Sequence, residues 1–66
     1  MSEPPNLVGQ LMDENITSLL MADPEKTWSI RVTRRNGMYS VVTKDYREDR
    51  INVELENGII VNQHVA

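Results

Sequence analysis

Cysteine is absent from this chain, and histidine occurs only once, as His64. Without cysteine there is no disulfide framework, and without a cluster of Cys and His side chains there is no structural metal site to stabilise a small fold. A chain of 66 residues forms a single domain, and at this size folding buries only about 60% of the surface that the unfolded chain exposes. The fold must therefore be stabilised by apolar packing, turns and polar networks.

Long apolar runs are absent as well. No run approaches the roughly 20 residues that span a bilayer, and residues 1–5 lack the basic and apolar regions of a signal peptide. We therefore expect no membrane partner. As written, the chain is expected to be cytoplasmic, or extracellular if an export signal was removed. An apolar content of 39% with 26% charged residues is typical of a soluble globular domain.

The residue patterns of catalytic sites are also missing. The chain has three glycines but no glycine-rich phosphate loop, and it has no spacing typical of metal ligands. His64 is interpreted as a surface or interface residue. We expect that the protein is not an enzyme and that it binds no metal ion or cofactor.

Positive charge is concentrated in one stretch of a chain whose net charge is −3. Six of the seven basic residues lie between positions 31 and 50, together with three acidic residues. Basic residues interleaved with acidic ones are not typical of a nucleic-acid surface, which carries little opposing charge. We expect no nucleic-acid partner, and binding through Arg34, Arg35 and Arg47 stays open as a weaker alternative.

Apolar residues between positions 7 and 21 recur every three or four positions, as on one face of an amphipathic helix. They are Val8, Met12, Ile16, Leu19 and Leu20. The prolines at positions 4 and 5 disfavour a helix just before them, and Asp23-Pro24 ends the pattern. The sequence therefore predicts an extended tail over residues 1–6 and a helix over about residues 11–22.

After Pro24 apolar and polar residues alternate, as in half-buried strands. One strand carries Trp28, Ile30 and Val32, and a second carries Ile51, Val53 and Leu55. Asn57-Gly58 marks a tight turn, after which a short third strand runs antiparallel to the second. The sequence therefore predicts an α+β domain with one helix packed on a small sheet.

The connection from Asn36 to Arg50 is long for a compact domain. Connections of this length are usually either functional or disordered. This one begins with the turn pair Asn36-Gly37 and contains Val41, Val42 and Tyr46, with no proline and a single glycine. This composition argues against disorder and favours an ordered, extended segment.

The residues of this segment resemble those of a known family. The run Val42-Thr43-Lys44-Asp45-Tyr46-Arg47-Glu48-Asp49-Arg50, followed by Ile51-Asn52-Val53, is similar to the reactive loop and following strand of the potato inhibitor I superfamily. That superfamily includes eglin and the chymotrypsin inhibitor of barley seed. The run looks closest to the microbial branch whose loops read V-T-x-D-Y-R-x-D-R-x-N-V. Leu7-Val8-Gly9, Asp23-Pro24 and Asn62-Gln63-His64-Val65 resemble further family segments in the same order.

This resemblance implies a helix packed on a small mixed sheet, with a long extended reactive loop, residues 41–50, between two parallel strands. It also implies a substrate-like, reversible inhibitor of serine proteases. The protease-binding residues would be Val41, Val42, Thr43, Lys44, Asp45, Tyr46 and Arg47. Lys44 would enter the specificity pocket, and the bond between Lys44 and Asp45 would be the reactive-site bond. A lysine is attracted to the aspartate at the base of a trypsin-type pocket, so we expect a trypsin-like partner, with subtilisin-like proteases as the other class.

Arg50 and Asn52 stand where this family places side chains that reach back under the loop. One guanidinium can brace both sides of the reactive-site bond, through Asp45 and through Thr43 or nearby carbonyl groups. Asn52 projects from the same face of the strand and would donate a second brace. We expect a monomer. The main alternative function is a non-inhibitory binding module that uses the same loop face for another protein.

Overall fold

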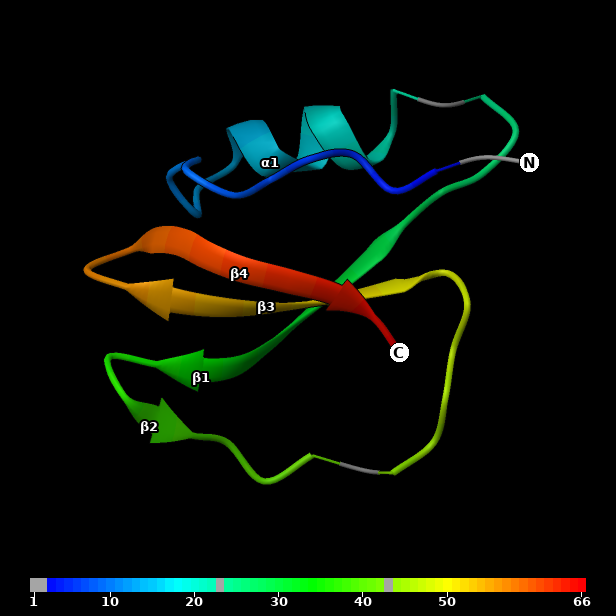
Figure 1. The fold of residues 1–66 in the computed structure, drawn as a ribbon. Helices are drawn as coiled ribbons and strands as arrows, with labels where there is room; N and C mark the ends of the chain where they lie inside the picture. The colour runs from blue at the N-terminus through cyan, green and yellow to red at the C-terminus, as the bar shows by residue number, and fades with distance from the viewer. Residues whose placement is uncertain (1–2, 23, 43) are drawn as a thin grey trace.

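The computed structural model describes residues 3–22, 24–42 and 44–66. Its elements are, in chain order, α1 (Asn15–Leu20), β1 (Ser29–Arg35), β2 (Met38–Tyr39), β3 (Arg50–Glu56) and β4 (Ile59–Val65). The strands form one mixed sheet in the order β2-β1-β3-β4, in which β1 and β3 run parallel and the other pairs antiparallel. The predicted α+β class, with one helix on a small mixed sheet, is confirmed (Figure 1).

Two Asn-Gly pairs make the hairpin turns. Asn36-Gly37 joins β1 to β2 with φ values of 51° and 82°, and Asn57-Gly58 joins β3 to β4 with φ values of 52° and 80°. Positive φ at both central residues matches the twist of the flanking strands. β2 pairs with the end of β1. The prediction of one uninterrupted connection from Asn36 to Arg50 is therefore wrong at its start, and the connection shortens to positions 40–49.

α1 is shorter than the helix predicted over residues 11–22. Just before it, the chain pairs with the hairpin that ends in β4: Met12 N donates to Gly58 O at 2.7 Å, and Gln10 O accepts from Ile60 N at 3.0 Å. Backbone groups that take part in this pairing are not available for a helix, because both structures use the same donors and acceptors. The apolar spacing therefore continues beyond the residues that are helical.

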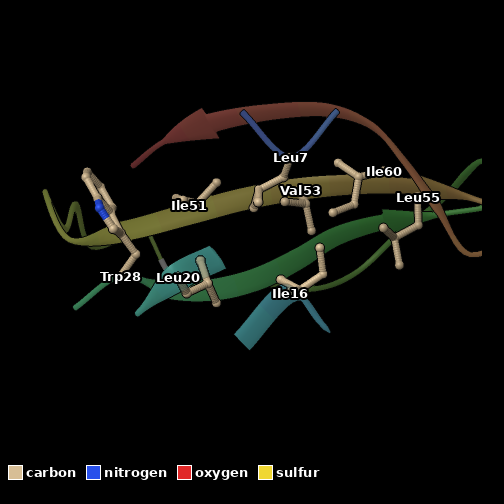
Figure 2. Packing of buried hydrophobic residues seen from close by; sticks show 8 residues of the cluster. All are labelled: Leu7, Ile16, Leu20, Trp28, Ile51, Val53, Leu55 and Ile60. Carbon is tan, nitrogen blue, oxygen red and sulfur yellow. The ribbon is translucent and has the colours of Figure 1, made fainter. Parts of the chain in front are cut away.

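The hydrophobic core lies between the sheet on one side and α1 with the N-terminal segment on the other. Its buried members are Leu7, Ile16, Leu20, Trp28, Ile51, Val53, Leu55 and Ile60 (Figure 2). The short helix contributes only Ile16 and Leu20. Two residues of the predicted apolar helix face, Val8 and Leu19, are 44% and 38% exposed. The core is consequently small, and its one aromatic ring, Trp28, lies at the end nearest the start of β1.

Gln63 on β4 fastens the predicted N-terminal tail. Residues 3–6 contain no helix or strand. The Gln63 amide accepts from Leu7 N at 2.6 Å through Oε1 and donates to Pro5 O at 2.9 Å through Nε2. The tail is thus held by its backbone at the point where the Leu7 side chain enters the core.

β3 is buried on both faces because different parts of the chain cover them. Ile51 and Val53 face the core, whereas Arg50 and Asn52, which are 9% and 3% exposed, lie on the opposite face. The chain from β2 to β3 forms an arc on the side of the molecule away from α1 (Figure 1). This arc contains the predicted reactive loop.

Candidate functional site

The predicted reactive loop is accessible along its length. All of its described contact residues are exposed, namely Val41, Val42, Lys44, Asp45, Tyr46 and Arg47. Val41 is fully exposed, and 71% of Tyr46 is accessible. Thr43 lies outside the described residues. The described part of positions 40–49 contains no helix or strand.

Arg50 joins the loop to the end of β4. Its guanidinium donates from Nη2 to Asp45 O at 2.5 Å and from Nη1 to Asp45 Oδ2 at 3.4 Å, and its Nε donates to Ala66 O at 2.9 Å. The Arg50 side chain is 11% exposed and that of Asp45 is 55% exposed. Because a solvated carboxylate contributes little to an ion pair, the bond to the Asp45 carbonyl is the stronger link to the loop.

The structure therefore brings the predicted tether Arg50 to the residue that directly follows the predicted reactive-site bond. The planar guanidinium fixes the directions of several donors at once. It thereby holds both the backbone and the side chain of Asp45. The expected second contact of Arg50, to Thr43, falls outside the described residues.

The Asn52 amide makes two contacts across the sheet. Its Oδ1 accepts from Arg31 Nε at 3.0 Å, and its Nδ2 lies 3.4 Å from His64 Nε2. Arg31, Asn52 and His64 are register partners on the adjacent strands β1, β3 and β4. The hydrogen bonds of the Asn52 amide to described residues thus run across the sheet. Arg31, Asn52 and His64 thus form a polar row across the sheet, and the brace from Asn52 to the loop stays a prediction.

The polar row fixes the proton on His64. Arg31 Nε can only donate, so the oxygen of the Asn52 amide faces Arg31 and its NH₂ group faces His64. That NH₂ group can only donate, so Nε2 of His64 accepts and the ring proton resides on Nδ1. Protonation of Nε2 would place two donors opposite each other and break this bond.

A cleft of about 400 Å³ separates the loop from the polar row. Side chains of the sheet and of the loop line it together. They are Arg31, Thr33, Tyr39, Asn52, Glu54 and His64 from the strands, and Val42, Lys44, Asp45 and Tyr46 from the loop, with Ala66 at the chain end. Because a space of this size separates the loop from the sheet, hydrogen bonds at particular points, rather than dense apolar packing, hold the loop in place.

The limb that follows the predicted reactive-site bond, residues 45–49, is fastened a second time at Asp49. Asp49 O accepts from Ser29 N at 2.8 Å and from Ser29 Oγ at 3.3 Å. The Asp49 carboxylate pairs with Arg47 through Oδ1 to Nε at 3.2 Å and Oδ2 to Nη2 at 3.1 Å. This hydrogen bonding with Arg47 lowers the pKa of Asp49 below its usual value of 3.8, against a smaller effect of desolvation. The contacts between described residues therefore concentrate on residues 45–49.

Sequence reasoning assigned no role to Arg31 and interpreted His64 only as a surface or interface residue. The sequence did contain a signal for the polar row, because strand alternation places positions 31 and 52 on polar faces of their strands. What the sequence could not supply was the register that aligns Arg31 with Asn52 and Asn52 with His64.

No protein-family model, curated protein or solved structure matches this chain. The resemblance to potato inhibitor I proteins therefore rests on the sequence motif. Within residues 3–22, 24–42 and 44–66, no helix is long and apolar enough to cross a membrane. The same residues contain no group of three or more His, Asp or Glu side chains arranged to hold a metal ion.

Proposed function

We propose that this protein is a substrate-like, reversible inhibitor of serine proteases. Lys44 enters the specificity pocket of the protease, and the bond between Lys44 and Asp45 is the reactive-site bond. The observation that carries the proposal is that the buried Arg50 guanidinium donates hydrogen bonds to Asp45. Asp45 directly follows Lys44, which is exposed. An ordinary surface loop needs no such tether.

A held loop favours binding because little freedom is lost when it docks. Ordering a flexible segment at an interface costs about 0.5–1.5 kcal/mol for each immobilised rotamer-rich side chain, and preorganisation reduces this cost. In this loop the backbone of residues 45–49 is already fixed by Arg50 and Ser29. A protease would therefore meet a limb that needs little further ordering.

The position of the tether also favours religation. When a serine protease cuts the bond, the acyl part ending in Lys44 becomes attached to the catalytic serine, and the part beginning at Asp45 carries the new amine. The acyl part is held covalently, so the new amine is the group that would leave. Arg50 and Ser29 hold this limb in place, which keeps the amine beside the ester and lets religation compete with water.

The charge of Lys44 favours trypsin-like proteases. A lysine in the specificity pocket pairs with the aspartate at its base. Both Lys44 and Asp45 line the cleft beneath the loop, but Lys44 is exposed and can turn toward a partner. Subtilisin-like proteases, which bind extended segments by their backbone, form the second target class.

The test is an inhibition assay of the purified chain against trypsin, chymotrypsin and subtilisin. The proposal predicts saturable inhibition of trypsin at or below micromolar concentration, with inhibitor and enzyme in a one-to-one complex. If no protease is inhibited and trypsin simply digests the chain at Lys44, the proposal fails. The chain would then be interpreted as a non-inhibitory binding module, and the exposed Val41 and Tyr46 would mark the same loop face as its contact surface.

A further inference from the structure

Lys26 reaches from the segment before β1 to the end of the loop. Its Nζ donates to Glu48 O at 3.0 Å and lies 4.1 Å from the centre of the Trp28 ring. The residue is half-buried, whereas a lysine in an irregular segment is ordinarily well solvated. Its ammonium group therefore makes two defined contacts, one with an aromatic face and one with a backbone carbonyl.

Trp28 gives this ammonium group a fixed support. The tryptophan is 4% exposed and lies at one end of the core cluster (Figure 2). A cation over an aromatic face is attracted by the ring quadrupole, and tryptophan attracts it best. Because the indole cannot move without disturbing the core, the fold determines where Nζ lies.

The carbonyl that Lys26 binds belongs to the limb that a cut at Lys44 would release. Arg50 holds the beginning of this limb at Asp45 O, and Ser29 holds its end at Asp49 O. Glu48 O lies between these two points, next to the second one. Since Lys26 binds the backbone, its effect does not depend on the side chain at position 48.

We propose that Lys26 is a positioning residue for the inhibition proposed above, on which this inference rests. Lys26, supported by Trp28, keeps the backbone of residues 45–49 in place after the bond between Lys44 and Asp45 is cut. It thereby favours religation over release of the new amine. In the intact chain the uncut bond between Lys44 and Asp45 also holds this limb, in addition to the Arg50 contact at Asp45. Lys26 therefore affects the rate at which bound chain is consumed more than the affinity of the intact chain.

The variant Lys26→Met tests this role, because it keeps an unbranched stem and removes the charge. Incubation with a trace of trypsin gives both an inhibition constant and, by mass spectrometry, the rate at which cleaved chain accumulates. We expect cleavage to become roughly three- to tenfold faster, as for loss of one partly exposed charged hydrogen bond. The inhibition constant should change less than about twofold. Lys26→Arg, which keeps a cation over Trp28, should be consumed at nearly the wild-type rate.

Two comparisons separate this role from general stability and from the proposed function. Ile16→Val weakens the core away from the loop and should not accelerate cleavage at temperatures where the chain stays folded. If it accelerates cleavage as much as Lys26→Met, or if Lys26→Met is consumed at the wild-type rate, the role of Lys26 is refuted while inhibition by the wild-type chain stands. If the wild-type chain does not inhibit trypsin at all, the proposed function fails and the role of Lys26 fails with it.

Discussion

Replacement of Arg50 by methionine removes the link between the loop and the sheet while keeping a side chain of similar reach. Two of the lost hydrogen bonds go to Asp45. The bond from a charged donor to the Asp45 carbonyl contributes about 1.5 kcal/mol. The pair with the carboxylate contributes about 0.5 kcal/mol, because the Asp45 side chain is 55% exposed.

These two contributions together amount to about 2 kcal/mol, which corresponds to roughly a 30-fold change in an equilibrium constant. If Arg50 holds the loop in its binding conformation, Arg50→Met should raise the inhibition constant for trypsin by about this factor and should speed cleavage after Lys44. The assay is steady-state inhibition, combined with thermal unfolding so that all variants are compared while folded. The third lost bond, to Ala66 O, affects the end of β4 and appears in the unfolding measurement.

Arg34→Met provides the matched control. Arg34 also pairs with an acid across the sheet, Glu54 at 3.3 Å, and its side chain is 23% exposed. Arg34→Met removes one positive charge, as Arg50→Met does, at a position outside residues 45–49. The control should change the inhibition constant by less than about fivefold, because an ion pair of this kind is worth at most about 1 kcal/mol. If Arg50→Met changes inhibition no more than this control does, the tether argument is refuted.

Three further predictions concern specificity and protonation. Lys44→Leu should weaken trypsin binding by at least about 30-fold, since removing one partner of a buried charge pair costs about 2–5 kcal/mol. It should also favour chymotrypsin or subtilisin, and an unchanged profile would exclude Lys44 as the residue in the specificity pocket. The pKa of Asp49 lies below 3.8, so the pair with Arg47 stabilises the fold above that value and its contribution is lost as the pH falls through the lowered pKa. An NMR titration should show this pKa returning toward 3.8 in Arg47→Gln, and no change would contradict the assigned cause. The neutral form of the His64 ring should carry its proton on Nδ1, and ¹⁵N shifts showing it on Nε2 would contradict the bond from Asn52.

Much of the fold could be predicted because its signals are local. Alternation around Val53 and a turn at Asn57-Gly58 identified the strands β3 and β4, since each depends on neighbouring residues only. The helix was predicted too long because the spacing of apolar residues does not show which backbone groups pair elsewhere. Here Gln10 and Met12 pair with the β4 hairpin. A two-residue strand such as β2 is too short to give a periodic pattern, although Asn36-Gly37 marked its turn.

In the candidate site, too, some contacts could be predicted from the sequence and others could not. Exposure of the loop and the contact between Arg50 and Asp45 agree with what the sequence motif implied. The contacts of Asn52 with Arg31 and His64 could not be predicted, because they depend on the register of three strands. The support from Lys26 could not be predicted either, because it joins residues 22 positions apart through a backbone carbonyl, which leaves no trace in the sequence.

Resynthesis of the reactive-site bond tests the central claim most directly. Chain cleaved between Lys44 and Asp45 is isolated and incubated with a catalytic amount of trypsin, and intact chain is treated in parallel. If the limb is held as proposed, both mixtures should approach the same ratio of intact to cleaved chain, and intact chain should appear from the cleaved sample. If the cleaved sample stays cleaved and the intact sample is consumed completely, the protein is a substrate and the account is wrong.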